Sequence, residues 1–104
     1  MAEHYNDTEE AVLTRLTVEE PPMYRVLLHN DDYTTMEFVV HILMNVFNKS
    51  MAEATQIMLN VHNNGLGVCG VYAYEVAETK VETVHNMARE SGFPLRCSME
   101  KDDS

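Results

Sequence analysis

The pattern of apolar and polar positions divides the chain after residue 22 into six regular segments. Three of them show the alternation and the β-branched or aromatic residues typical of strands, over 23–29, 66–74 and 95–100. The other three repeat apolar residues at helical spacing, over 35–48, 51–63 and 75–91. The order β-α-α-β-α-β predicts an α+β fold. We expect a two-layer sandwich in which three helices cover one face of a three-stranded antiparallel sheet.

Local signals predict where these helices begin and end. Thr34 with Glu37, and Ser50 with Glu53, have the S/T-x-x-E spacing of a capping box, which predicts helix starts directly after Thr34 and Ser50. Gly65 follows two asparagines and is a strong stop signal. The helix predicted over 35–48 is apolar on two sides, which indicates either deep burial or an apolar edge left for a ligand.

Glycines and cysteines within the predicted strands carry further information. Gly67 and Gly70 weaken the strand at 66–74 and indicate a β-bulge or close packing by a helix. Cys69 and Cys97 have no CxxC spacing and lie in strand-like runs. We interpret them as reduced core residues of a cytosolic protein.

The charge distribution is strongly acidic, with a formal net charge of -10. Residues 1–20 hold six acids and one base, Arg15, and Pro21-Pro22 follows. We predict a flexible acidic tail over residues 1–22 and one folded domain over residues 23–104. No cluster of Lys and Arg suits a phosphate backbone, and no apolar run approaches the roughly 20 residues of a membrane span. We therefore expect no nucleic acid or membrane as a partner, and a cytoplasmic location.

The most informative polar cluster is Asn30, Asp31 and Asp32, which follows the first predicted strand and precedes a helix. No Lys or Arg lies between Arg25 and Lys49 to neutralise it. Such a junction can bind a small positive group. The same residue types also form turns by accepting hydrogen bonds from their own backbone, and the residues alone leave both interpretations open. The spacing does not match a calcium-binding loop.

His62, near the end of the second predicted helix, is a second candidate, although a lone histidine there is more often structural. With Asp31 or Asp32 it could form the acid/base pair of a small enzyme. The chain has no GxSxG motif, no glycine-rich phosphate loop and no metal-binding histidine spacing. We therefore expect a binding module that is not an enzyme and has no metal or cofactor.

The chain contains eight methionines, a high number for 104 residues. Methionine suits a pocket that must accept side chains of differing shape, because its thioether chain is flexible. Core packing is the more common role for apolar residues at helical spacing. Both roles are open for Met36, Val39, Met58, Val61 and Leu95.

Four segments resemble the ClpS adaptor family, in the same order and at matching spacing. They are NDDYTTMEF at 30–38, ATQIMLNVH at 54–62, CGVYAYEVAETK at 69–80 and GFPLRCSMEK at 92–101. The resemblance covers about residues 22–101. It implies an α/β sandwich of three strands and three helices. It also implies an adaptor that binds the N-terminal residue of a substrate, the N-degron, and delivers the substrate to a ClpA-like or ClpC-like AAA+ unfoldase of the ClpP protease.

The resemblance further implies roles for matching positions. The α-amino group of the substrate would be bound by Asn30, Asp31 and His62, with Asp32 assisting near the first peptide unit. The pocket for the first side chain would be lined by Thr34, Met36, Val39, Met58, Val61 and Leu95. The N-terminal domain of the unfoldase would be docked by Glu75 and Lys80. Leu, Phe, Tyr and Trp are the usual first residues in the family, and Met36 would exclude β-branched Ile and Val.

Three positions depart from the family pattern. Thr35 stands where proline is usual, Tyr74 where a small residue is common, and Arg96 where an apolar residue is frequent. Tyr74 would alter docking of the unfoldase, and Arg96 would alter the mouth of the pocket. The alternative interpretation is a partner-binding module of the type found in the C-terminal domain of the ribosomal stalk protein. That module has a similar fold and does not recognise N-degrons.

Overall fold

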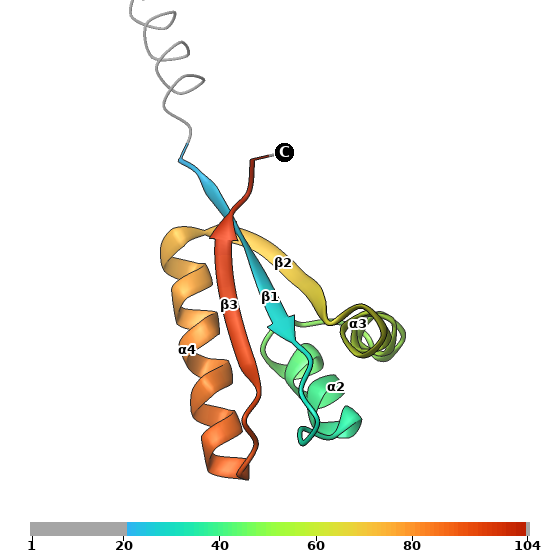
Figure 1. Ribbon diagram of the computed structural model, residues 1–104. Coiled ribbons are helices and arrows are strands. Elements are labelled where there is room, and N and C mark those ends of the chain that lie inside the picture. Colours follow the sequence, from blue (N-terminus) through green and yellow to red (C-terminus); the bar gives the residue numbers. More distant parts are fainter. Residues whose placement is uncertain (1–20, 104) are drawn as a thin grey trace, which may run out of the picture.

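The computed structural model describes residues 21–103 and confirms the predicted order of elements (Figure 1). The elements are β1 (Met23–His29), α2 (Met36–Asn45), α3 (Met51–Asn64), β2 (Leu66–Ala73), α4 (Tyr74–Ser91) and β3 (Arg96–Lys101). Residues 1–20 of the predicted tail, and Ser104, lie outside the described residues.

The three strands form one antiparallel sheet in the order β2-β1-β3, with β1 in the centre. The pairing of β1 with β2 shifts at one point: Val26 pairs with Gly70, and Leu27 pairs with Val68. Cys69 is therefore the extra residue of a β-bulge, as the glycine pattern of this strand predicted.

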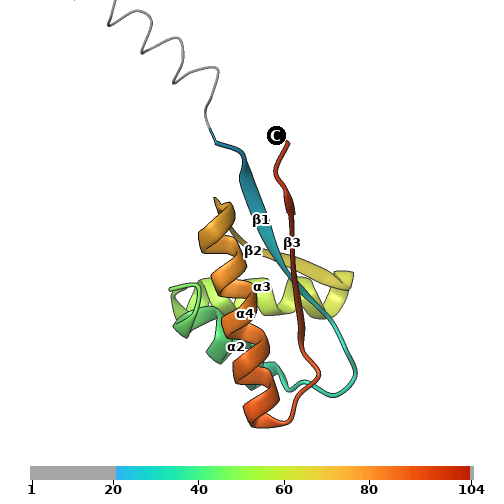
Figure 2. The same ribbon diagram turned by 90° about the vertical axis from the view of Figure 1, so that its left-hand side faces the viewer.

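The hydrophobic core lies between one face of the sheet and the helices. Val26 and Leu28 of β1 are fully buried on that face, together with Ile42 and Leu43 of α2. Figures 1 and 2 show α4 running along the strands, and α2 and α3 grouped near the end of the sheet where β1 leads into α2. Both cysteines have free thiols and are buried in this core, as predicted.

The start of α2 corrects one prediction. Thr35, and not Thr34, is the N-cap, and its hydroxyl oxygen accepts a hydrogen bond of 3.1 Å from the Phe38 N–H. The capping box predicted for Thr34 with Glu37 is therefore wrong. The helix also ends at Asn45, three residues before the predicted end. The Thr34 hydroxyl is used elsewhere, in the turn that precedes the helix.

The ends of α3 follow the sequence signals. Ser50 and Glu53 form the predicted capping box, because each side chain accepts a hydrogen bond from the backbone N–H of the other. Gly65 ends the helix with a φ of 92°, a left-handed conformation that favours glycine. Gly92 ends α4 in the same way, with a φ of 79°.

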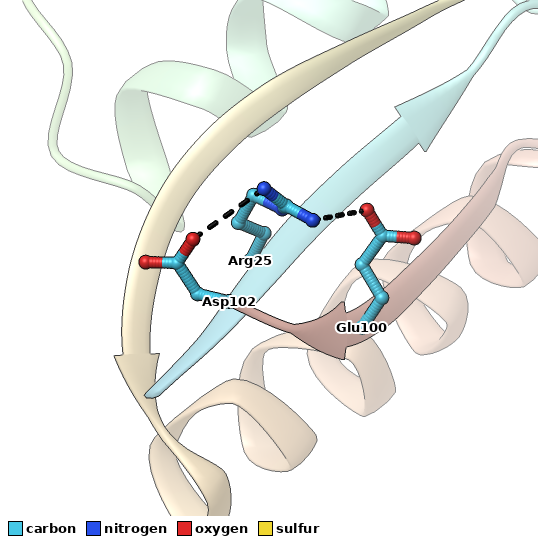
Figure 3. Close-up of polar contacts among 3 residues, drawn as sticks. All are labelled: Arg25, Glu100 and Asp102. Atoms are coloured by element: carbon cyan, nitrogen blue, oxygen red, sulfur yellow. Dashed lines mark hydrogen bonds and ion pairs between the residues drawn. The ribbon is translucent and has the colours of Figure 1, made fainter. Parts of the chain in front are cut away.

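Arg25 links β1 to the C-terminal end of the domain on the face of the sheet opposite the core (Figure 3). Its guanidinium lies 2.9 Å from a Glu100 carboxylate oxygen and 3.4 Å from an oxygen of Asp102. The Asp102 N–H donates a hydrogen bond of 2.7 Å to the Met23 carbonyl. The last described residues are thus fixed beside the start of β1. Within residues 21–103, no helix has both the length and the apolarity needed to cross a membrane.

Candidate functional site

A cavity of about 230 Å³ lies between the segment that follows β1, the start of α2 and the last turns of α3. It brings together all of the predicted binding residues except one. The residues that line it are Asn30, Asp31, Asp32, Thr34, Met36, Val39, Met58, Val61 and His62. The exception is Leu95, which precedes β3, is only 4% exposed and packs in the core.

A backbone contact explains why residues far apart in the sequence meet here. The Asn30 N–H donates a hydrogen bond of 2.8 Å to the carbonyl oxygen of Gly65. Gly65 is the C-cap of α3, and His62 lies in the last turn of that helix. The end of β1 is therefore fastened to the end of α3, which places His62 and the Asn30–Asp32 segment on the same cavity.

Asp31 is bound into the turn that leads to α2. One of its carboxylate oxygens accepts hydrogen bonds from the backbone N–H groups of Tyr33 (2.8 Å) and Thr34 (2.7 Å), and the other accepts one from the Thr34 hydroxyl (2.7 Å). Partial burial opposes ionisation of Asp31, but the bonds from Thr34 and Tyr33 outweigh it and hold the pKa of Asp31 below its usual range. The turn chemistry that the residue types allowed is present, and it keeps this carboxylate charged.

The other three polar residues have hydrogen-bonding groups available to a ligand. Within the described part of the chain, the side chains of Asn30, Asp32 and His62 make no hydrogen bond, and all three residues are exposed. A carboxylate has about four acceptor positions, so Asp31 retains about one after its three internal bonds. The polar side of the cavity therefore offers an amide oxygen, two carboxylates and a ring nitrogen.

The opposite side of the cavity is apolar. Val39 and Val61 are 6% and 3% exposed, while Met36 is 46% exposed and Met58 is partly buried. A volume of about 230 Å³ is below the range of about 300–1,000 Å³ that takes a drug-sized ligand. The cavity suits one side chain that is attached to a hydrogen-bond-donating cationic group.

The two predicted docking residues lie in different surroundings. Glu75 is exposed in the first turn of α4 and lines a cavity of about 250 Å³ together with Pro22, Tyr24 and Tyr74. Tyr74, one of the departures from the family pattern, meets the Tyr24 ring edge-on at 5.2 Å. Lys80 does not line that cavity, and its ammonium contacts the end of α2.

The structure also shows a groove between α2 and α3. The apolar pattern of the first helix allowed an apolar edge for a ligand, but no separate site was predicted there. The groove adjoins the cavity and is lined in part by Met44 and Met51. The signal that could have found it is the row formed by Met36, Val40 and Met44, which recur every four residues along α2. Among residues 21–103, no group of three or more His, Cys, Asp or Glu side chains could hold a metal ion.

The chain thus forms a small α+β domain with a cavity that has one polar and one apolar side. Residues 19–98 match the family model described as ATP-dependent Clp protease adaptor protein ClpS. The chain therefore belongs to the ClpS family of adaptor proteins of the Clp protease, as the sequence motifs indicated.

Two relatives and one solved structure illustrate the similarity. The ClpS adapter of Desulfatibacillum aliphaticivorans is 70% identical over 91 residues, which cover 86% of this chain and 88% of the relative. The ClpS adapter of Desulfotalea psychrophila is 53% identical over 102 residues, which cover 98% of this chain and 100% of the relative. The structure of ClpS2 from Agrobacterium tumefaciens bound to L-phenylalaninamide matches with a TM-score of 0.77 and 38% identity, over 79% of this chain and 99% of that one.

Proposed function

We propose that this adaptor recognises N-degrons in the cavity between β1, α2 and α3 and delivers the bound proteins to a ClpA-like or ClpC-like AAA+ unfoldase. The observation that carries the proposal is the division of the cavity into a polar and an apolar side. The ligand of the Agrobacterium relative has matching chemistry. L-phenylalaninamide has a free α-amino group, an aromatic side chain and an amide in place of the next peptide bond.

On the polar side, the substrate's α-amino group would be held by Asn30, Asp31 and His62, with Asp32 near the first peptide unit. A free α-amino group has a pKa of about 8 and is mostly cationic at neutral pH. Charge-assisted hydrogen bonds to such a group contribute roughly 1.5–3 kcal/mol each. An acetylated or internal residue has no ammonium group and leaves these acceptors unpaired, which is the physical basis of selectivity for chain ends.

On the apolar side, the first side chain would pack against Met36, Val39, Met58 and Val61, beside Thr34. Burial of a Leu or Phe side chain contributes roughly 1.5–3 kcal/mol. Leu95 would act from the core behind these residues, since it does not line the cavity. We expect Leu, Phe, Tyr and Trp to be accepted and β-branched residues to be rejected.

For delivery, we propose that the unfoldase's N-terminal domain docks on the surface around Glu75. Glu75 is exposed beside the cavity that Pro21 and Pro22 also line, so the proposed docking surface adjoins the point where the acidic N-terminal segment joins the folded domain. Lys80 would act in docking chiefly by holding α4 against the end of α2. The two buried free thiols fit a cytoplasmic site of action.

Fluorescence anisotropy with three labelled peptides tests the recognition step. The peptides begin with Phe, with N-acetyl-Phe and with Ile, and are otherwise identical. We expect micromolar or tighter binding of the Phe peptide and at least tenfold weaker binding of the other two, a difference of about 1.4 kcal/mol. Equal binding of all three, or of none, would leave the Asn30–Asp32 segment with a structural role only and would favour a general partner-binding module.

A further inference from the structure

We infer that the groove between α2 and α3 is a second subsite, which binds an apolar side chain at one of positions two to five of the same substrate. This inference rests on the proposed function of the adjoining cavity. The groove has a volume of about 570 Å³. Its apolar wall is formed by Met36, Val40 and Met44 of α2 and by Met51 and Met58 of α3, and Glu37, His41, Asn45 and Thr55 are its polar lining residues.

The groove is continuous with the cavity. Met36 and Met58 line both of them, so one ends where the other begins. Both methionines have unbranched, flexible side chains that can adjust to the shape of a neighbour. A chain that enters the cavity with its first residue therefore has an apolar surface directly beside it.

The length of the groove fits a short stretch of extended chain. Met36 and Met44 are eight residues apart on α2, which corresponds to about 12 Å along the helix axis. An extended chain advances about 3.3–3.6 Å per residue, so the groove spans three to four residues. Those are the residues that follow a first residue held in the cavity.

The chemistry of the groove selects apolar side chains. Met36 and Met51 are 46% and 61% exposed, so their thioether groups are available to a ligand. The charged side chain at the rim is that of Glu37, and the lining contains no Lys or Arg. An acidic side chain would lie near Glu37 and leave the methionines uncovered, whereas a Leu or Phe would cover them, and His41 and Asn45 contribute the other polar groups of α2 to the lining.

The test uses a series of labelled peptides that begin with Phe and continue with serine. One residue at a time, from position two to position five, is changed to Leu or to Asp. We expect one or two Leu positions to tighten binding about tenfold over the all-serine peptide, as burial of roughly half a Leu side chain would give. Asp at the same positions should give no gain.

Variants assign the gain to the groove. Met44→Ser and Met51→Ser should reduce the gain from Leu to less than threefold, measured within each variant against the all-serine peptide. Leu59→Ser is the matched control, because Leu59 is an exposed apolar residue of α3 (39%) that does not line the groove. It should retain the full gain. Far-UV circular dichroism and urea denaturation of each variant identify any loss of fold.

The outcomes separate the two proposals. A gain of less than twofold at every position, or a gain that persists in both groove variants, overturns the subsite while the Phe-first peptide still binds. If the all-serine Phe peptide does not bind better than its acetylated form, the proposed function fails and the subsite fails with it.

Discussion

The ammonium group of Lys80 donates a hydrogen bond of 2.8 Å to the carbonyl oxygen of Val46 and so joins α4 to the end of α2. The last carbonyl groups of a helix have no partner within the helix, and this bond satisfies one of them. The same ammonium lies 5.6 Å from the centre of the Phe47 ring and 5.2 Å from that of Tyr72. Lys80 therefore has a structural role whether or not it also contacts the unfoldase.

The first prediction is that Lys80→Ala destabilises the protein. The loss of one charge-assisted hydrogen bond and of the contacts with two aromatic rings should lower the free energy of unfolding by about 2 kcal/mol. Urea denaturation followed by circular dichroism measures this. Glu75→Ala is the control, because its exposed side chain should change stability by no more than about 0.5 kcal/mol.

If Lys80→Ala is as stable as the parent protein and yet fails to bind a ClpA-like N-terminal domain, the lysine acts through direct docking alone. If both variants lose binding and only Lys80→Ala is destabilised, Glu75 supplies the contact and Lys80 positions it.

The second prediction concerns Asp31, whose carboxylate accepts three hydrogen bonds within its turn. Asp31→Ala should lower the free energy of unfolding by about 1–3 kcal/mol, because the N–H groups of Tyr33 and Thr34 lose their acceptor. Asp31→Asn keeps an oxygen acceptor and should cost less. Asp32→Ala, at an exposed neighbour, is the control for stability and should be close to neutral.

The pH dependence of stability follows from the lowered pKa of Asp31. A carboxyl group with a lower pKa in the folded state stabilises the fold above its unfolded-state pKa of about 3.9, and the contribution is lost as the pH falls further. Between pH 5 and pH 3, the parent protein should therefore lose stability more steeply than Asp31→Asn. Parallel curves of urea midpoint against pH for the two proteins would contradict this.

Most of the fold was predictable because its signals are local. The apolar periods gave all six elements in order, and the Ser50–Glu53 capping box and Gly65 marked the ends of α3 correctly. The start of α2 was placed one residue early, because two consecutive threonines both suit an N-cap. Only the backbone conformation and the competing bond from Thr34 to Asp31 decide between them.

The residues of the candidate site were named through the resemblance of four segments to the ClpS family. Local sequence patterns alone did not indicate which of these residues lie together. The bond from Asn30 to Gly65 and the bond from Lys80 to Val46 join segments that are distant in the sequence, and no local pattern indicates either. Leu95 illustrates the same limit, since an apolar residue next to a strand can face a pocket or the core. In the structure it lies in the core.

The third prediction concerns the contact of β2 with α3. A Cβ atom at Gly67 would lie 2.8 Å from Cγ2 of Val61 and 3.4 Å from the Ile57 carbonyl oxygen. The sequence indicated such close packing, and Gly67→Ala should therefore destabilise the protein by about 1–3 kcal/mol. It should also displace the helix turn that carries His62, and so weaken binding of a Phe-first peptide.

A double-mutant cycle tests whether Val61 is the source of the clash. Val61→Ala removes Cγ2, so the cost of Gly67→Ala should be smaller in that background than in the parent protein. Urea denaturation of the four proteins gives the coupling energy. Additive costs would show that the Ile57 carbonyl, or the strand itself, determines the effect.

The fourth prediction concerns the two buried thiols. Burial raises the pKa of Cys97 to about 12 and also raises the pKa of Cys69. Because the thiolate is the reactive form, neither cysteine should react with a disulfide reagent such as DTNB at pH 8 in the native protein. Both should react at once in 6 M guanidinium chloride. Rapid labelling of the native protein would mean that the core opens locally around β1.

The fifth prediction concerns shape selection at the edge of the cavity, and it rests on the proposed function. Met36 is about half exposed and lines both the cavity and the groove, so its side chain limits the space beside the first residue of a substrate. An Ile or Val side chain is branched at Cβ and needs that space close to the backbone. Met36→Ala should therefore raise the affinity for an Ile-first peptide relative to a Phe-first peptide by about tenfold, or about 1.4 kcal/mol.

The matched control for this last variant is Met51→Ala. It removes the same side chain from a position that lines the groove and not the cavity, so its ratio of Ile to Phe affinity should equal that of the parent protein. Anisotropy titrations with both peptides give the ratios. An unchanged ratio in Met36→Ala would assign the rejection of β-branched residues to the buried valines, Val39 and Val61, because they form the rest of the apolar wall with Met58.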